Sequence, residues 1–197
     1  MRYDAEHKQK TRAKVLEVAA KAIRKDGPEG IGVASVMAEA GLTHGGFYAH
    51  FRSKEDLVDA AIGQMFEESR ARVQHEMGGL SPAEGLGAYI DFYLSKRHRD
   101  ARGAGCPVAA LASDLPRLTD DTRLLFAEGT RRLAASMSEK LSAMGHQNPD
   151  ALARSMVSEL VGALSLARVE TDAARSDAIL DDSRRSLKQR LGLEPTA

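Results

Sequence analysis

The stretch GLTHGGFYAHFRSKEDL, residues 41–57, decides how this chain is organised. Just before it, the segment 33–40 repeats apolar residues at helical spacing, and Gly41 follows at the place where helices commonly end in a left-handed residue. Thr43 can cap a very short helix, and Ser53 can cap the next one, with an acidic residue at the capping-box position. The stretch therefore predicts three closely spaced helices joined by tight turns.

The connection Gly41-Leu42-Thr43 has the spacing of a helix-turn-helix, whose second helix enters the major groove of DNA. Gly41 permits the sharp turn, Leu42 can fill a three-helix core, and the Thr43 hydroxyl can reach a phosphate. Residues 44–46, His-Gly-Gly, come next at the exposed start of the second helix. Because each glycine inside a helix costs about 1 kcal/mol relative to alanine, this pair indicates that a close approach of the backbone to DNA is required.

The aromatic residues that follow divide into core and surface. Phe47 and Phe51 lie four residues apart and are expected to be buried, whereas Tyr48 and His50 can donate hydrogen bonds to the DNA backbone. Lys54, with the free N–H groups at the start of its helix, forms a natural phosphate clamp.

Helical periodicity and its interruptions predict an all-α fold of about nine helices and no strand. The first helix covers about residues 8–26 and stops at Gly27-Pro28. After the helix that Ser53 caps, a turn at residues 78–82 is followed by further helical pattern. The remaining expected elements are a helix around Leu86–Leu94, a loop over Asp100–Gly105, and helices over Pro107–Leu115, Thr119–Met144, Ala151–Glu170 and Ser176–Leu191.

Composition and charge agree with a small basic module on a larger body. The chain has 197 residues, of which 43% are hydrophobic and 5% aromatic, with no Trp, and this favours helix over strand. Formal net charge is zero overall. Residues 1–54 nevertheless hold ten Lys/Arg against six Asp/Glu, a net charge of +4, which leaves −4 on residues 55–197. A DNA-binding domain over residues 1–54 and a sensing and dimerisation domain over 55–197 are expected.

The stretch 41–57 resembles the recognition helix and following turn of the TetR/AcrR family of transcriptional regulators. Tyr48, the aromatic residue at 51, Ser53-Lys54-Glu55 and Leu57 fall at the spacing of that family, as does the Gly27 stop. The resemblance covers about residues 8–66 and departs at Gly32, where the family usually has a capping Thr or Ser. It implies a DNA-binding regulator that acts as a homodimeric repressor on a palindromic, double-stranded operator. Carried over residue by residue, it puts at the DNA Ser35, Thr43, His44, Gly45, Gly46, Tyr48, His50 and Lys54, with Thr11 or Arg12 touching phosphate.

The same resemblance implies a homodimer joined by the last two helices. Apolar residues suited to such an interface are Leu152, Met156, Leu160, Leu164, Ile179, Leu180, Leu187 and Leu191. Ordinary core is the alternative interpretation. The small residues Gly162, Ala163 and Ser165 would let helices approach closely and favour the interface.

Helices between about Leu57 and Met144 are expected, again from the resemblance, to enclose a cavity for an unknown small-molecule inducer. Candidate wall residues are Met65, Phe66, Tyr89, Phe92, Tyr93, Leu111, Phe126 and Met137, although such residues at helical spacing are usually simple core. The six His residues show no ligand spacing, and one cysteine cannot form an internal disulfide or a multi-thiolate site. No metal and no cofactor are predicted.

The single cysteine, Cys106, is a candidate redox-sensing residue. Arg99, Arg102 and the start of a helix at Pro107 would all stabilise a thiolate. The segment from Gly105 to Asp114 also resembles a subgroup of the family that includes the electrophile-sensing repressor of N-ethylmaleimide reductase. Two modes of release from DNA are therefore expected as alternatives: binding of a pocket ligand, or modification of Cys106 by an electrophile or oxidant. The other interpretation of Cys106 is an inert, buried cysteine.

Other classes of protein fit the sequence less well. No Ser/His/Asp order, phosphate loop or paired-carboxylate motif appears with usable spacing, so an enzyme is not expected. The alternative is a helical ligand-binding or interaction protein that does not bind DNA. The residues His44, Tyr48 and Lys54, which suit DNA contact, argue against this alternative. No apolar stretch approaches the roughly 20 residues of a membrane span, and the N-terminus lacks a hydrophobic signal core, so a cytoplasmic protein with no membrane partner is expected.

Overall fold

The computed structural model of this chain describes residues 2–193, with side chains from Glu6 onward. Those residues form nine α-helices and three short 3₁₀-helices with no strand, which confirms the all-α prediction. The α-helices are α1 (Arg2–Gly30), α2 (Val33–Glu39), α3 (Lys54–Met77), α4 (Pro82–Tyr93), α5 (Lys96–Asp100), α6 (Pro107–Leu111), α7 (Asp120–Ala143), α8 (Pro149–Val169) and α9 (Ala173–Arg190). The 3₁₀-helices are η1 (His44–Ala49), η2 (Arg102–Ala104) and η3 (Leu115–Arg117).

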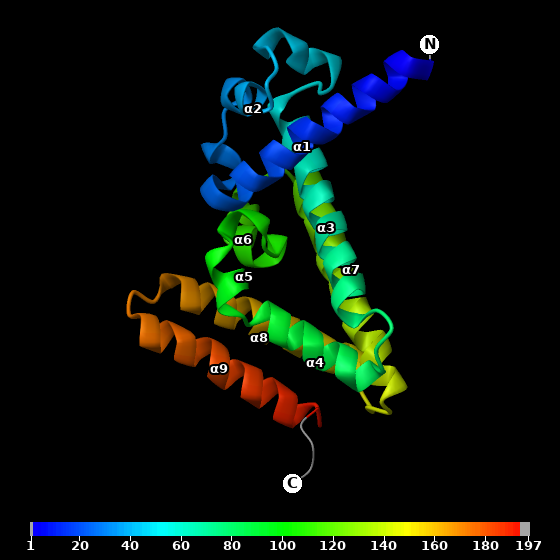
Figure 1. The fold of residues 1–197 in the computed structure, drawn as a ribbon, viewed down its shortest axis with the longest axis vertical. Coiled ribbons are helices and arrows are strands. Elements are labelled where there is room, and N and C mark those ends of the chain that lie inside the picture. The colour runs from blue at the N-terminus through cyan, green and yellow to red at the C-terminus, as the bar shows by residue number, and fades with distance from the viewer. Residues whose placement is uncertain (1, 194–197) are drawn as a thin grey trace.

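The first unit packs α1, α2 and η1 around one small core at one end of the molecule (Figure 1). Its helices form because each contributes an apolar stripe at helical spacing, and all stripes face inward. The buried residues are Val15, Ala19 and Ile23 of α1, Val36 and Met37 of α2, and Phe47 and Phe51 in and after η1. The start of α3 closes this core with Leu57 and Val58, so the unit is fixed to the rest of the chain.

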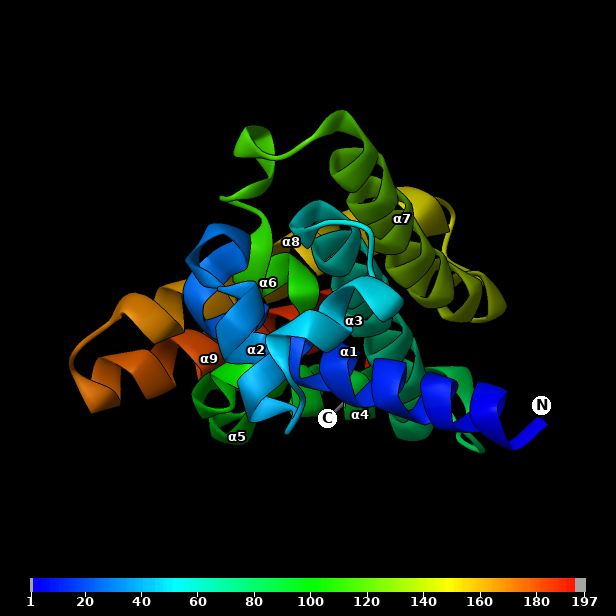
Figure 2. The same ribbon diagram turned by 90° about the horizontal axis from the view of Figure 1, so that it is seen from above.

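The second unit is a frame of long helices. Helices α3 and α7 run side by side away from the first unit, and α4 and α8 lie across their far ends (Figure 1). Helix α9 packs against α8 on the outside of the frame. Seen from above, α1 lies across α3, and α7 lies beside α3 on the side away from α1 (Figure 2). The short elements η2 and α6 contact α1, while α5 and α6 contact α8, so this segment connects the first unit with the last two helices.

Helix ends follow the predicted signals at several places. The Ser53 hydroxyl accepts the Asp56 N–H at 3.2 Å at the start of α3, and Asp56 in turn accepts the N–H of Arg52 at 2.9 Å. Ser81 and Glu84 form a complete capping box at α4. Gly27 and Gly41 have φ of 76° and 71°, positive values that glycine tolerates. Gly41 follows the end of α2, whereas the predicted stop at Gly27 is a kink within α1, which continues to Gly30.

Three predicted elements are wrong in part. Thr43 precedes η1, but its side chain makes no capping hydrogen bond, and the segment is a 3₁₀-helix because two glycines support an α-helix poorly. The expected loop Asp100–Gly105 contains the end of α5 and η2, since Ser95 caps α5 by accepting the N–H of His98. The helix that starts at Pro107 ends at Leu111 rather than Leu115, and Pro116 lies inside η3.

Among residues 2–193, no helix is both long and apolar enough to cross a bilayer.

Candidate nucleic-acid interface

The segment η1 separates core from surface as the sequence predicts. Phe47 and Phe51 are buried with their rings stacked at 5.6 Å between centroids. Between them the chain exposes Tyr48, whose side chain is 71% exposed and touches Phe47 edge-on at 5.3 Å. His44 and Gly45 are also exposed. Three polar or bare positions are therefore presented on a rigid aromatic support.

The two glycines of η1 differ in what surrounds them. A Cβ added at Gly45 would meet nothing within 4 Å, whereas one at Gly46 would lie 3.7 Å from the Met37 methyl group. Neither residue has a positive φ. Nothing among the described residues therefore requires glycine at position 45. This supports the interpretation that another molecule, such as DNA, must approach the backbone closely there.

Helix α2 places Ser35 on the exposed side of its first turn. Its N-cap is Gly32, which has no side chain to cap the helix, and the helix begins with the Val36 N–H donating to the Gly32 carbonyl at 3.0 Å. The weak cap expected at Gly32 is thus confirmed. Thr43 is exposed beside η1, so its hydroxyl and that of Ser35 both lie at the surface near the turn.

His50 lies half-buried behind η1. Its Nδ1 atom is buried and has no hydrogen-bond partner among the described residues. Burial lowers the pKa of His50, and the positive charges of Lys8 and Arg12 lower it further. Without DNA, the imidazole is therefore mainly uncharged at neutral pH.

The predicted phosphate clamp at Lys54 has an internal partner. Its Nζ atom donates to the carbonyl of Glu29, near the end of α1, at 3.1 Å. Arg12 of α1 lies with its guanidinium 4.8 Å above the centre of the Phe51 ring. Both cations are thus held at the edge of the first unit.

Sequence reasoning missed two further cations of α1. Lys14 reaches the turn, because its Nζ atom lies 3.5 Å from a Cβ placed on Gly41, and Lys8 lies close enough to His50 to affect its pKa. Both side chains are exposed. The four-residue spacing of Lys8 and Arg12, which puts them on one helix face, is the signal that could have found Lys8. The side chains of Arg2 and Asp4, counted in the predicted net charge of +4, lie outside the described residues.

A cavity of about 400 Å³ opens between α1, α3, α4 and the segment from α5 to Cys106. Three of the predicted wall residues line it, namely Tyr89, Phe92 and Tyr93. Phe66 instead lines a second hollow of about 400 Å³ between α3 and α7. The other four candidates belong to the buried hydrophobic core and line neither hollow: Met65, Leu111, Phe126 and Met137.

An ion pair that the sequence did not indicate lies in the wall of the first cavity. The Arg24 guanidinium of α1 donates to the Glu68 carboxylate of α3 at 2.6 Å, and the Arg24 side chain is only 3% exposed. Gln64 also donates to Glu68, at 3.2 Å. A charged residue at a position of the apolar face of α1 was the available signal, because buried charges are normally paired.

Cys106 lines the same cavity and is buried, with 5% exposure. Its backbone N–H donates to Nε2 of His98 at 3.2 Å, so Nδ1 of that ring carries the proton and donates to the Tyr93 carbonyl at 2.8 Å. Burial lowers the pKa of His98 to about 4. His98 is therefore a neutral bridge between α4 and the Cys106 segment.

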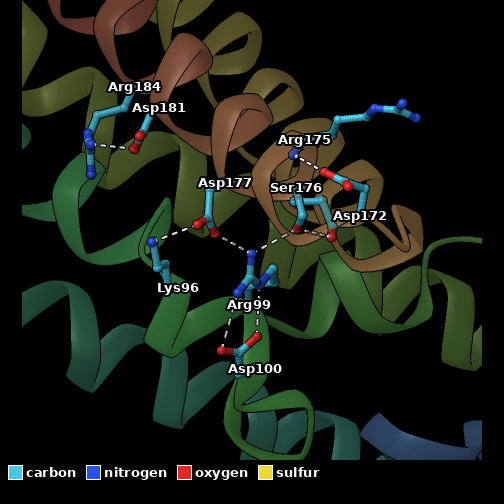
Figure 3. A network of polar contacts seen from close by, with 10 residues as sticks. Lys96, Arg99, Asp100, Asp172, Arg175, Ser176, Asp177, Asp181 and Arg184 are labelled. Carbon is cyan, nitrogen blue, oxygen red and sulfur yellow. Dashed lines mark hydrogen bonds and ion pairs between the residues drawn. The ribbon is translucent and has the colours of Figure 1, made fainter.

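The expected support of a Cys106 thiolate by Arg99 is wrong. Arg99 points to α9, where it donates to Ser176 and Asp177 at 2.8 Å each (Figure 3). Lys96 pairs with the same Asp177 at 2.6 Å, so this polar cluster joins α5 to α9. Arg102 is exposed.

The apolar residues predicted for the dimer interface belong mainly to the core of the single chain. Buried among them are Met156, Leu160, Leu164, Leu180, Leu187 and Leu191, while Leu152 and Ile179 are partly buried. They are buried because α8 packs against both α7 and α9. Of the small residues, Ala163 is buried, and Gly162 and Ser165 are half-buried. The exposed apolar residues of α8 are Leu166, at 63%, and Val169, at 78%, which the sequence did not single out.

Comparison with known proteins agrees with this architecture. Residues 15–61 match the family described as bacterial regulatory proteins, tetR family, and residues 82–181 match the LmrA/YxaF-like transcriptional regulator C-terminal domain. The chain belongs to the TetR family of transcriptional regulators. It is thus a DNA-binding helix-turn-helix regulator and not an enzyme, and the alternative of a protein without DNA binding is set aside.

Relatives of this TetR regulator span most of its length. The regulator LmrA of Bacillus subtilis is 28% identical over 137 residues, which cover 68% of this chain and 73% of LmrA. An uncharacterized regulator in the lacX 3' region of Lactococcus lactis is 26% identical and covers 82% of this chain and 85% of its own.

Solved structures show the same fold. A TetR-family regulator from Agrobacterium tumefaciens superposes with a TM-score of 0.77 at 27% identity, covering 91% of this chain and 98% of its own. The reduced form of Escherichia coli NemR gives a TM-score of 0.79 at 23% identity, covering 91% and 96% of the two chains.

The neutral His98 predicts how stability depends on pH. Its pKa is about 4 when folded and 6.5 at its ordinary value, so the unfolded chain binds the proton first as the pH falls. The contribution is fully present above about pH 6.5 and is lost between about pH 6.5 and 4, to a total of roughly 3 kcal/mol in the free energy of unfolding. Urea unfolding of wild type and His98→Gln at pH 7.5 and 5.0 measures it. The wild type should lose more stability than the variant, and equal losses would contradict the assignment.

Proposed function

We propose that this TetR regulator is a repressor that binds a palindromic operator as a homodimer and leaves it when a small molecule fills the cavity or an electrophile modifies Cys106. The observation that carries the proposal is the exposure of Tyr48, His44 and Gly45 on the buried Phe47–Phe51 support. Exposed polar and bare positions on a rigid support are what reading a groove requires.

In this proposal η1 lies in the major groove. Tyr48, Thr43 and Ser35 bind phosphate oxygens through their hydroxyls, and His44 with the bare backbone at Gly45 approaches base edges. The remaining proposed contacts are Gly46, His50 and Lys54 beside them. Lys8, Lys14 and Lys54 surround the turn and add sequence-independent attraction to the phosphates, which salt weakens.

Two substitutions in η1 test the DNA contact. Tyr48→Ala removes an exposed ring and hydroxyl, so it should abolish binding to the upstream region of the regulator's own gene without unfolding the protein. Gly45→Ala has room for its Cβ in the free protein, so stability should stay the same or rise while affinity for DNA falls about tenfold or more. Fluorescence anisotropy with labelled DNA at several salt concentrations, together with thermal unfolding, measures both quantities.

The matched control for these variants is Ala49→Ser, a change of similar size at an exposed position of the same segment. The affinity of Ala49→Ser for the specific DNA should lie closer to that of the wild type than the affinity of Gly45→Ala does. If Tyr48→Ala and Gly45→Ala both bind the DNA as wild type does, η1 is not the reading element.

The proposed dimer uses the outer face of α8 with α9. Leu166 and Val169 are exposed there, and Gly162 and Ser165 lie on neighbouring turns, so two helices can approach closely. In such a dimer the two η1 segments must lie about 34–36 Å apart, or a multiple of that distance, to meet successive major grooves on one side of the DNA. A palindromic operator follows from this two-fold symmetry.

Leu166→Asp tests the interface. A charge at this position cannot be buried without a partner, so the variant should sediment as a monomer at concentrations where the wild type is a dimer. Its affinity for operator DNA should fall because the two half-sites are no longer bound together. Leu124→Asp on α7 is the matched control, since Leu124 is 65% exposed, and it should remain dimeric. A dimeric Leu166→Asp protein, or a wild type that is a monomer, contradicts the proposal.

Release at Cys106 is supported by its position in the cavity wall, where a small reagent can reach the otherwise buried sulfur. In a maleimide addition the thiol loses its proton to solvent, and the sulfur bonds to one alkene carbon as the carbon–carbon π bond breaks. The other alkene carbon then takes up a proton from solvent. The added group occupies the cavity beside Tyr93 and His98 and pushes on the segment that contacts α1.

Treatment with N-ethylmaleimide separates the two modes of release. Intact mass should show one adduct on the wild type and none on Cys106→Ser, and only the wild type should lose affinity for its DNA. Cys106→Ser is the matched control because it keeps the size and polarity of the side chain. Complete modification with unchanged DNA binding would remove Cys106 from the release mechanism and leave the cavity ligand.

A further inference from the structure

We propose that the cavity lined by Arg24, Tyr93 and Cys106 binds a flat organic carboxylate, and that Arg24 and Tyr93 recognise its oxygens. The inference rests on the proposed function, because it names the chemical class of the ligand that the cavity takes.

The shape of the cavity favours a flat apolar body. The rings of Tyr89, Phe92 and Tyr93 line it together with His98, whose ring stacks on Phe92 with 5.2 Å between centroids and 18° between planes. The volume of about 400 Å³ lies within the range of pockets for small organic ligands. An aromatic ring in the cavity could pack against these rings in the offset or edge-to-face arrangements that aromatic pairs prefer.

The polar groups of the wall lack acceptors. Tyr93 Oη and Arg24 Nε are both buried, and neither meets the geometry of a hydrogen bond with any described residue. The Cys106 thiol lies beside Tyr93 Oη, but a thiol is only a weak hydrogen-bonding group. Burial raises the pKa of Tyr93 well above its ordinary value, so its hydroxyl keeps its proton and can donate it. Arg24 Nε can only donate. Since buried donors are nearly always bonded, a ligand that supplies acceptor oxygens would satisfy both.

His98 cannot take that role. Both of its ring nitrogens are already engaged, one with the Cys106 N–H and the other with the Tyr93 carbonyl. The ligand's polar contacts therefore fall on Arg24 and Tyr93.

The charge around the cavity favours an anion over a neutral acceptor. Arg24 is balanced by Glu68 at 2.6 Å and Arg72 by Glu76 at 3.3 Å. Arg168 lies behind the wall, 3.0 Å from a Cβ placed on Gly105, and donates to two backbone carbonyls. Arg168 makes no salt bridge with a carboxylate of the described residues, and Asp100 acts on its charge only from a longer distance. A carboxylate in the cavity would offset that charge.

The position of Arg24 connects recognition with DNA release. Arg24 belongs to α1, the first helix of the DNA-binding unit, and Glu68 belongs to α3. A ligand carboxylate at Arg24 competes with Glu68 for the same guanidinium. Binding therefore weakens the contact that fixes α1 to α3, and the two η1 segments of a dimer lose their common spacing.

The test uses benzoate, 2-naphthoate and 9-anthracenecarboxylate, each beside its primary amide, in calorimetric titrations of the full chain without DNA. Each amide keeps the ring and the carbonyl oxygen but has no charge. At least one acid should bind about tenfold or more tightly than its amide. Equal affinity within every pair, or no binding by any acid, overturns the proposal.

Two variants assign the contact. Tyr93→Phe removes only the unpartnered hydroxyl, so its thermal stability should equal or exceed that of wild type while its affinity for the acid falls about tenfold. Arg24→Lys keeps the positive charge but lacks the Nε–H group, so its affinity for the acid should fall by a similar factor. Tyr48→Phe, the same deletion of a hydroxyl on an exposed ring far from the cavity, should bind the acid as wild type does. A folded Tyr93→Phe protein with unchanged affinity for the acid overturns the assignment even where Arg24→Lys does not fold.

Adding the same acids and amides to the protein bound to labelled DNA, with fluorescence anisotropy as the readout, distinguishes this inference from the proposed function. An acid that binds through Arg24 and Tyr93 but leaves the protein on its DNA supports the ligand class and contradicts release by a cavity ligand. The converse, release from DNA by the amides as well as the acids, supports cavity-controlled release and contradicts the carboxylate.

Discussion

Both units of the molecule depend on the buried face of α1. Val15, Ala19 and Ile23 on that face form the core beneath η1, and Arg24 continues the face as far as Glu68 of α3. The end of the same helix contacts η2 and α6, which lead to Cys106 and α8. A buried ion pair contributes little net stability, but it demands one arrangement of its two helices, because either charge left alone is strongly unfavourable. In the proposed release by a cavity ligand, this ion pair would tie the position of η1 to the state of the cavity.

The segment from α4 to α6 gives this dependence a physical route. His98 is held from both sides by neutral hydrogen bonds, and Arg99, the next residue, is held by Ser176 and Asp177 of α9. Arg168 of α8 binds the carbonyls of both residues. A group that enters the cavity and displaces His98 thus acts on α1 at one end and on the last two helices at the other. Ligand and electrophile would act through the same segment.

Local signals predicted the DNA-binding unit well because its structure is set by short-range chemistry. Gly27 kinks α1 and Gly41 ends α2 through positive φ, Ser53 caps α3, and the Phe47–Phe51 spacing fixes which side is buried. The cavity and the outer face of α8 were predicted less well. Periodicity finds an apolar face but does not say which helix covers it, so Leu160 and Leu164 fit an interface or a core equally well in the sequence. The packing of α8 against α7 and α9 buries them within the chain. Contacts distant in sequence, such as Arg24 with Glu68 or Arg99 with Asp177, leave no local pattern.

The central claim is that two copies of η1, fixed at one spacing, read a symmetric DNA site. Selection of bound fragments from a random-sequence DNA library, followed by sequencing, tests it most directly. The claim predicts two inverted half-sites whose centres lie about 10 base pairs, or a multiple of that, apart, and no enriched sequence with Tyr48→Ala. Enrichment of a single unrepeated site, of half-sites at variable spacing, or of the same sequence by wild type and Tyr48→Ala would contradict it.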